Sequence, residues 1–385
     1  DHQGLAGSRV LQLHHPKRND PHPFRVADMS TYTISIMKKE QESETKELMQ
    51  RCFDKSLASI FFLHPDTTLV VLYEGRVVAG LNLDVYRVND QVNMGYLGWL
   101  YTDEKHRGKG LAGKLISESL PFLKSLGCTD VAACVEGDNP ASFKQLENEG
   151  FSRLPLVGQI RRFRFGLFRV WKHASRFFDM GYFMWHLHLD GATRQGYPEN
   201  CKAFVLGSVA NTLLFLPDLL GWNLLSLLNL SWMQVSHPNK SLLVAIPLLS
   251  LLVRTLPSLV FAHTRKIQLV YRQWDTAYFT ALLLPFLAGL PFPVPGNLYI
   301  QGSNWSMKTH ARSLARMSLV SNTSLALLFI LLPNPYTLFL LTLDTFFFFY
   351  PFCGFNASRI MREGWNYRTY GIILTLACYA FLLVY

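Results

Sequence analysis

Charged residues are scarce in the second half of this 385-residue sequence. Residues 203–385 contain 11 basic and 4 acidic residues, whereas residues 1–202 contain 26 basic and 23 acidic ones. The low charge density and the repeated long apolar runs exclude a purely cytosolic enzyme, a secreted disulfide scaffold and a disordered chain. We therefore expect a soluble first half followed by a membrane domain.

Closely spaced cysteine pairs and a dense basic patch are also lacking. None of the six cysteines has C-x-x-C spacing, so neither a zinc knuckle nor a disulfide framework is indicated, and we predict buried free thiols. Most of the net charge of +10 falls in short loops of the second half, where the positive-inside bias accounts for it. No nucleic acid partner is therefore expected.

The first 28 residues lack an apolar run long enough for a signal peptide, and we expect a polar, disordered tail. Residues 29–190 alternate between strand and helix patterns, which predicts a mixed α+β domain. The expected strands are 32–40, 67–88 (a hairpin turning at Glu74 and Gly75), 91–102, 129–137 and 181–190, and the expected helices are 43–55, 110–127 and 139–150.

A glycine-rich turn, RGKGLAG, follows the strand that ends at Thr102 and precedes a helix. Glycines at such a turn let backbone N–H groups approach an anion, and the helix N-terminus adds partial positive charge, so a pyrophosphate would fit there. The Walker pattern G-x-x-x-x-G-K-[ST] is absent. The dinucleotide fingerprint G-x-G-x-x-G is matched formally from Gly108 to Gly113, without the acidic residue expected after a following strand.

This turn, together with the strand before it, resembles the coenzyme A motif [RQ]-x-x-G-x-[GA] of the GNAT superfamily of N-acetyltransferases. A second segment, from Asn139 to Phe151, is similar to the family's N-x-x-A…G-F stretch, although Ser142 stands in place of its alanine. The resemblance covers about residues 31–190. It implies a sheet whose splayed central strands hold acetyl-CoA, the acyl donor. It also implies that an amine accepts the acyl group.

The resemblance also implies the residues that contact the donor. The backbone of the fourth strand would pair with the pantetheine, the glycine turn would hold the pyrophosphate, and an asparagine would touch the cofactor arm. These residues are Leu100, Tyr101 and Thr102 for the pantetheine, Arg107, Gly108, Lys109, Gly110, Leu111 and Ala112 for the pyrophosphate, and Asn139 for the arm.

Two departures from the family pattern concern proton transfer. Leu146 stands where many members have a tyrosine that protonates the departing thiolate, and the fourth strand offers no carboxylate to accept the amine proton. Glu136, at the end of the fifth strand, is the nearest candidate base, and an ordinary solvated loop acid is the alternative. Because thioester transfer can proceed largely by orientation, the missing tyrosine does not remove the predicted activity.

Basic and aromatic residues alternate through residues 157–178, which we interpret as an insertion lying in an anionic headgroup layer. RNA binding is the alternative. The strand that follows places His186, His188 and Asp190 on one face, where they could bind zinc. A structural role is favoured for them, and no metal site is assigned.

Residues 191–385 are expected to form an all-α polytopic membrane domain. Its apolar segments are 203–233, 241–262, 276–290, 314–332, 336–352 and 370–385. The third is short and followed by LPFPVPGN, which indicates a re-entrant element. If the soluble domain faces the cytosol and this segment does not cross, every basic cluster of the membrane half is cytosolic. We therefore predict five spans and one re-entrant segment.

This half also resembles, more faintly, the site-2-protease-like membrane zinc peptidases. SLVFAH occupies the place of their S-H-E-x-x-H, and FNASRI parallels L-D-G-S-R-I. Only His263 survives among the ligands, because Leu259, Val260 and Asn356 replace the first histidine, the base and the carboxylate. One histidine cannot hold a catalytic zinc ion, so the resemblance implies an inactive protease scaffold, and a generic helical bundle is the alternative.

Together these observations predict a membrane-anchored N-acetyltransferase that transfers an acetyl or short acyl group from acyl-CoA to an amine near the inner leaflet. The alternative is a catalytically weak acyl-CoA sensor coupled to a pseudo-protease membrane domain. An intramembrane peptidase is disfavoured by the lost ligands.

Overall fold

The computed structural model describes residues 31–384, except 54, 178, 192–199, 220–241, 289–291, 293–294 and 349–353. The predicted polar tail lies outside the described residues. The chain divides into two compact units, which are described separately. Unit 1 comprises Asp1–Ala132 with His188–Ala192, and unit 2 comprises Ala133–Leu187 with Thr193–Tyr385.

Unit 1 is an antiparallel sheet with two helices. Its elements are β1 (Tyr32–Ile36), α1 (Glu42–Cys52), β2 (Thr68–Tyr73), β3 (Arg76–Asn89), β4 (Val92–Thr102), α2 (Leu111–Ser125) and the start of β5 (Asp130–Glu136). Strands β1 to β4 pair in chain order. The predicted hairpin turn is confirmed, since Glu74 and Gly75 both have positive φ angles, of 50° and 78°, as a tight two-residue turn requires.

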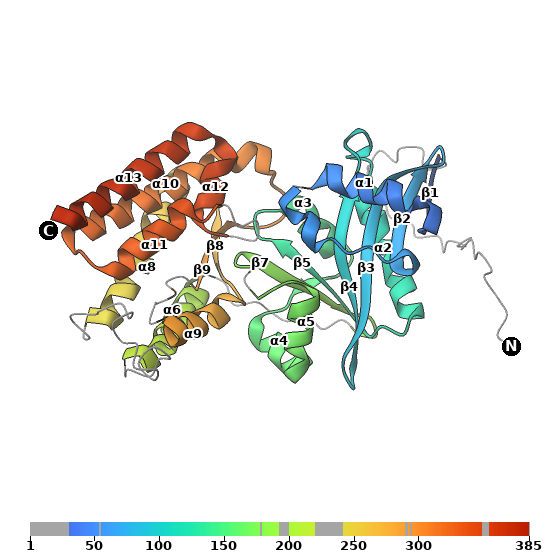
Figure 1. Ribbon diagram of the computed structural model, residues 1–385, viewed down its shortest axis with the longest axis horizontal. Helices are drawn as coiled ribbons and strands as arrows, with labels where there is room; N and C mark the ends of the chain where they lie inside the picture. Colours follow the sequence, from blue (N-terminus) through green and yellow to red (C-terminus); the bar gives the residue numbers. More distant parts are fainter. Residues whose placement is uncertain are drawn as a thin grey trace. The chain divides into compact units, whose positions relative to one another are not determined.

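Strand β4 carries a bulge just before the predicted cofactor residues. Leu83 pairs with Leu97 but Leu81 pairs with Leu100, so β4 holds one extra residue at this point. A bulge reverses which side chains face each side of the sheet. Helices α1 and α2 cover opposite faces of these strands (Figure 1), and Tyr101 joins Leu48 of α1 in one buried cluster.

Unit 2 begins with part of the family-like α+β pattern and continues into helices. Its elements are α3 (Pro140–Asn148), β6 (Ser152–Arg153), α4 (Leu156–Phe163), α5 (Leu167–His173), β7 (Tyr182–His188), α6 (Asn200–Leu219), α8 (Leu242–Thr264), β8 (Leu269–Gln273), α9 (Ala277–Ala288), β9 (Gly296–Ile300), α10 (Met307–Leu331), α11 (Pro335–Phe346), α12 (Asn356–Glu363) and α13 (Trp365–Val384). The main sheet has the order β1-β2-β3-β4-β5-β7-β6. We call residues 200–384 the helical region.

The helical region is packed onto residues 133–187 without a break. Arg359 of α12 binds Asp138 through two hydrogen bonds, Nε to Oδ2 at 2.7 Å and Nη2 to Oδ1 at 3.0 Å, and both side chains are buried. Gly181 and Gly354 approach so closely that a Cβ atom on Gly181 would lie 2.5 Å from the Cα of Gly354. Buried contacts thus join residues 133–187 to the helical region, and the predicted domain boundary near residue 190 stays a prediction.

The helical region is not all-α, which corrects the sequence-based expectation. Strands β8 and β9 form a two-stranded antiparallel sheet in which Leu269 pairs with Ile300 and Gln273 with Gly296. Trp274 N donates to Pro295 O at 2.8 Å where the two strands approach each other. LVYRQ and GNLYI are short segments that contain β-branched and aromatic residues, which favour strands. The surrounding apolar and proline-rich sequence concealed this signal.

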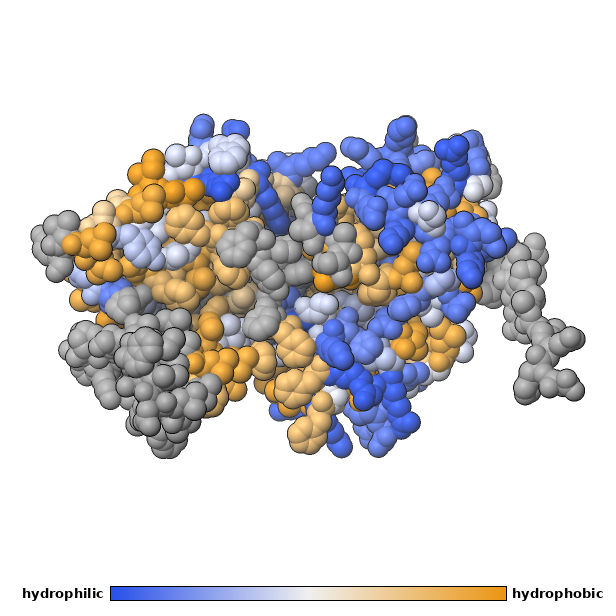
Figure 2. Space-filling view, viewed as in Figure 1, coloured by the Kyte–Doolittle hydropathy of each residue, from blue (hydrophilic) through white to orange (hydrophobic). Residues whose placement is uncertain are grey.

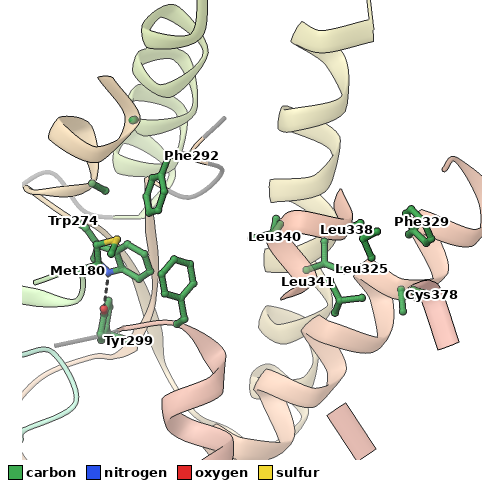
Figure 3. Packing of buried hydrophobic residues seen from close by; sticks show 14 of the residues in the cluster. Met180, Trp274, Phe292, Tyr299, Leu325, Phe329, Leu338, Leu340, Leu341 and Cys378 are labelled. Carbon is green, nitrogen blue, oxygen red and sulfur yellow. Dashed lines mark hydrogen bonds between the residues drawn. The ribbon is translucent and has the colours of Figure 1, made fainter. Parts of the chain in front are cut away.

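A large buried cluster holds unit 2 together (Figure 3). The hydroxyl of Tyr299 accepts a hydrogen bond of 2.7 Å from Trp274 Nε1, and the ring centroids of Trp274 and Phe292 lie 5.2 Å and 6.2 Å from that of Phe355. The cluster continues into leucine and phenylalanine side chains of α10 and α11. Residues far apart in the sequence, from Met180 to Cys378, thus share one core.

Two helices in the described part of the chain, Ala245–Thr264 and Met307–Leu331, are long and apolar enough to cross a membrane. They are 44% and 50% buried, and core helices of soluble proteins meet the same measure. The predicted third segment forms the 12-residue α9, about 18 Å long and too short for a span. The five-span topology stays a prediction, and part of its first segment lies outside the described residues.

Polar side chains are buried among these helices. Arg254 of α8 binds Asp344 of α11 through Nε to Oδ2 at 2.6 Å and Nη2 to Oδ1 at 2.9 Å. The side-chain amide of Asn356 donates to Asp344 Oδ2 at 3.1 Å and to Asn322 Oδ1 at 3.2 Å. Asn356 is thus a partner of a buried ion pair, whereas His263 is exposed at the end of α8.

The described cysteines are free, as predicted, but their burial differs from the prediction. Cys128 and Cys378 are buried, Cys52 and Cys134 are half-buried, and Cys201 is exposed. The prediction of burial was wrong for Cys201, because this residue lies on the outer side of the first turn of α6.

Candidate functional site

The glycine turn after β4, Arg107 to Ala112, has open space around its two glycines, and we call it the glycine cradle. Gly108 and Gly110 have φ angles of +77° and +78°, which glycine adopts without strain. A Cβ atom on either would meet nothing within 4 Å. Helix α2 begins at Leu111, and its first N–H groups have no acceptor within the helix, so they are available to an anion in front of the turn.

The side chains of the glycine cradle are tied to neighbouring residues. Arg107 Nε donates to Thr102 O at 3.2 Å, which brings the turn and the end of β4 together. Lys109 Nζ donates to the hydroxyl of Tyr32 at 2.8 Å, and this hydroxyl also lies 3.0 Å from His106 Nδ1. The backbone of the cradle, rather than the Lys109 ammonium group, therefore offers the anion site.

The predicted pantetheine strand is held from behind by Tyr101. Its hydroxyl donates to Asn82 Oδ1 at 3.0 Å, and its buried ring fills the space left by Gly80, where a Cβ atom would clash. Burial raises the pKa of Tyr101 well above its ordinary value, so the phenol stays protonated. Tyr101 has a structural side chain, and the pairing of the 100–102 backbone with a ligand stays a prediction.

Glu136 and Asn139 belong to unit 2, where each has a partner. The carboxylate of Glu136, at the end of β5, accepts a short hydrogen bond from Arg362 Nη2 through Oε1. Asn139 caps α3, with its Oδ1 accepting from Ser142 N at 3.2 Å. Glu136 is therefore not the freely solvated loop acid of the alternative interpretation.

A cavity of about 740 Å³ opens beside Glu136. We call it the Glu136 cavity. It is lined by the end of β5 and the start of α3 on one side and by the start of α10 with Arg362 on the other; the lining residues are Glu136, Asp138, Asn139, Pro140, Ala141, Lys144, Ser303, Asn304, Trp305, Ser306, Met307, Thr309, His310 and Arg362. Residues 303–310 and Arg362 could not be predicted as part of this site, because they lie more than 150 residues away along the chain.

The surroundings of Glu136 raise its pKa above the usual value. Burial is the main cause, and the nearby carboxylate of Asp138 adds to it. The guanidinium groups of Arg362 and, to a smaller extent, Arg359 act in the opposite direction. A carboxylate with a raised pKa is a better proton acceptor near neutral pH than a solvated one.

The three residues considered as zinc ligands have separate partners. His186 packs edge-on against Phe163. His188 Nδ1 lies 3.0 Å from Thr129 O, and Asp190 pairs with Lys124 at 3.1 Å. In the part of the chain that the structure describes, no three histidine, cysteine, aspartate or glutamate side chains are grouped to hold a metal ion.

The basic aromatic segment folds into α4 and α5 between β6 and β7, as an insertion there requires. Its apolar side chains Val157, Ile160 and Phe168 are exposed, and Phe165 is 94% exposed. Arg176 differs from the prediction, because it is fully buried, with Nε 2.7 Å from Asp179 Oδ2 and Nη2 3.5 Å from Asp275 Oδ2.

Comparisons with known proteins agree with this arrangement. Residues 33–151 match the model of the acetyltransferase (GNAT) family. N-alpha-acetyltransferase 30 of Schizosaccharomyces pombe is 31% identical over 97 residues, which are 24% of this chain and 63% of that protein. The chain thus spans less than two thirds of this curated relative.

Solved structures give weaker likenesses. The NatC complex bound to Gag peptide and CoA contains a chain that is 17% identical, with a TM-score of 0.32, covering 41% of this chain and 98% of that one. The protein yncA of Salmonella typhimurium with its cofactor acetyl-CoA is 19% identical, with a TM-score of 0.30, covering 43% of this chain and 99% of that one. Residues 33–151 are thus similar to the acetyltransferase (GNAT) family.

Proposed function

We propose that this protein is a membrane-anchored N-acetyltransferase that transfers an acetyl or short acyl group from acyl-CoA to an amine near the inner leaflet. The observation that carries the proposal is the open glycine cradle within the family match, with Gly108 and Gly110 at positive φ and free space in front of both. A pyrophosphate fits the exposed N–H groups there. Acetyl-CoA, as donor substrate, supplies the activated thioester.

In this proposal, Glu136 accepts the proton of the amine acceptor. An acceptor ammonium group transfers one proton to the Glu136 carboxylate, and the free amine then attacks the thioester carbonyl carbon. The C–N bond forms as the C–S bond breaks, and a second proton leaves the nitrogen and is taken up by the departing sulfur. Glu136 returns its proton to water, so each turnover releases one proton.

The first acceptor to test is the α-amine of a peptide. The curated relative is an N-alpha-acetyltransferase by name, and its 97 matched residues are 31% identical to this chain. The Glu136 cavity, about 740 Å³ in volume, has room for several residues of a peptide. Aminosugar and aminolipid amines are the other acceptors to compare.

Membrane anchoring is supported by the distribution of charge in the helical region. Basic residues just after α8 and in the first turns of α10 and α13 gather at one end of the bundle; they are Arg265, Lys266, Lys308, Arg312, Arg316 and Arg368. This end is defined by contacts such as Ser258 Oγ to Met317 O, 3.0 Å, and Arg316 Nε to Tyr367 Oη, 3.4 Å. On the face drawn in Figure 2, many of the described side chains of the helical region are apolar. The positive-inside rule places such an end in the cytosol.

The α4–α5 surface supports contact with an anionic lipid surface. Phe165 and Phe168 are exposed beside the exposed Arg161, Arg164 and Lys172. Aromatic rings with a basic surround suit an anionic headgroup layer.

Release of coenzyme A by the full-length protein in nanodiscs tests the enzyme. With acetyl-CoA and a five-residue peptide that has a free α-amine, we expect release, together with acetylation of the peptide at its N-terminus by mass spectrometry. The second candidate function, an acyl-CoA sensor, is favoured by Leu146 in place of the usual tyrosine. Saturable acetyl-CoA binding with no release to peptide, aminosugar or aminolipid amines would support the sensor instead.

Topology is tested by labelling single cysteines with an impermeant maleimide in a chain whose native cysteines are replaced by serine. Lys308→Cys, in the first turn of α10, should be labelled only in inside-out vesicles. Pro333→Cys, after α10, is the matched site and should be labelled only in right-side-out vesicles. Labelling of both from one side would refute a spanning α10.

A further inference from the structure

An ion pair joins the GNAT domain to the helical region inside the Glu136 cavity. Glu136 lies within the family match, and Arg362 lies 226 residues later, in α12. The two side chains are 20% and 34% exposed, respectively, so the pair is partly shielded and not a free surface contact. Both residues line the cavity.

The other charged groups around Glu136 already have partners. Arg359 is held by two hydrogen bonds to Asp138 and donates to Leu298 O at 2.6 Å. Lys144 Nζ donates to Asn304 Oδ1 at 2.9 Å. His310 Nδ1 lies 2.7 Å from Thr309 Oγ1. Arg362 is therefore the cation that binds the Glu136 carboxylate directly.

We propose that Arg362 is a positioning residue for Glu136, and that the helical region thereby completes the amine-acceptor site of the enzyme. This inference rests on the proposed function of Glu136 as proton acceptor. It gives the helical region a part in the reaction beyond anchoring, since α10 supplies the opposite wall of the cavity and α12 supplies the guanidinium group.

The guanidinium group acts on the carboxylate in two ways. Its hydrogen bond to Oε1 fixes the carboxylate plane and leaves Oε2 as the second oxygen to accept a proton. Its positive charge also favours the ionised form against the burial that disfavours it. Without Arg362, the carboxylate would be protonated up to a higher pH and could not take the amine proton there.

The pH dependence of kcat/KM for coenzyme A release tests this role in the full-length protein, with the five-residue peptide as acceptor. In Arg362→Gln, the acidic limb should move up by about one pH unit, a loss of about tenfold on that limb with little loss on the plateau. Arg362→Lys keeps the positive charge, so its acidic limb should lie close to that of the parent protein. Arg312→Gln is the matched control. Arg312 of α10 forms an ion pair of 2.8 Å with Glu363, the residue after Arg362 in α12, and this pair lies outside the cavity. Its profile should not move.

A uniform loss at every pH in Arg362→Gln, with the limb in place, would overturn the proposal and leave Arg362 with a merely structural role. A second measurement does not depend on turnover. The infrared C=O band of protonated Glu136, identified by its loss in Glu136→Gln, should titrate at higher pH in Arg362→Gln than in the parent protein. An unmoved titration refutes the role of Arg362, whereas a moved titration without any coenzyme A release supports it and refutes the proposed enzyme.

Discussion

The glycine cradle is formed by consecutive residues, whereas the Glu136 cavity is formed by residues that lie far apart in the sequence. The cradle occupies six consecutive residues, and its shape follows from the φ angles of Gly108 and Gly110 and the start of α2. The cavity joins the end of β5 to side chains of α10 and α12 that lie 160 or more residues away. A motif reports backbone conformation that is local, whereas a site made of distant side chains leaves no pattern along the chain.

The largest effect is expected where the cavity is held together. Arg359→Gln removes the cation from a buried ion pair and leaves Asp138 without its two hydrogen bonds, which should destabilise the protein by about 3–5 kcal/mol. Chemical denaturation in detergent measures this loss. Arg312→Gln breaks an exposed pair and should cost about 1 kcal/mol or less. Equal losses in the two variants would mean that the contact between Arg359 and Asp138 does not hold unit 2 together.

The next effect concerns the cradle. Gly110→Asp places a carboxylate in the anion site, so acetyl-CoA should no longer stabilise the full-length protein, a loss of about 2.7 kcal/mol at a hundredfold excess over its dissociation constant. Thermal unfolding with and without acetyl-CoA measures it.

Gly75→Asp is the matched control for the cradle. Gly75 has the same φ of +78° and the same open surroundings, but it lies in the β2–β3 turn. Its variant should pay the same backbone strain and keep the response to acetyl-CoA. If both variants lose the response, strain and not the phosphate site explains Gly110.

Local signals accounted for much of the fold. The turn at Glu74 and Gly75, the helix that starts after Gly110 and the last strand β7 were all predicted, because glycine placement and side-chain alternation act within a few residues. Strands β8 and β9 were missed, because five residues each in a largely apolar sequence do not differ from helix segments until they pair.

Charge partners were the part that the sequence could not give. Arg176 was expected at the surface, since it continues a run of basic residues, but Asp275, 99 positions away, makes its burial possible. Glu136 was named as a candidate without its partner Arg362 for the same reason. The free energy of burying a charge depends on a counter-ion that only the folded chain supplies.

Asn356 tests whether the resemblance to a zinc peptidase or the contacts in the folded chain better explain this residue. Its alignment with a zinc ligand in the second resemblance treats it as a lost carboxylate, whereas the structure has its amide donating to Asp344 at 3.1 Å. Asn356→Asp would replace this donor with a second carboxylate and should destabilise the protein by about 1.5–3 kcal/mol. Denaturation of Asn356→Asp beside the parent protein measures it. A stable variant that gains zinc would favour the protease scaffold.

The smallest effect is expected at His263, the one ligand that the second resemblance retains. Its side chain is exposed at the end of α8, so His263→Ala should change the free energy of unfolding by less than about 0.5 kcal/mol. Metal analysis of the purified protein should give the same zinc content before and after the change. His186 and His188 must also be replaced in both samples, so that histidines outside the helical region do not contribute. Zinc at about one ion per chain that falls only with His263→Ala would contradict this prediction. Further residues would then complete a zinc site with His263, as the resemblance to the zinc peptidases implies.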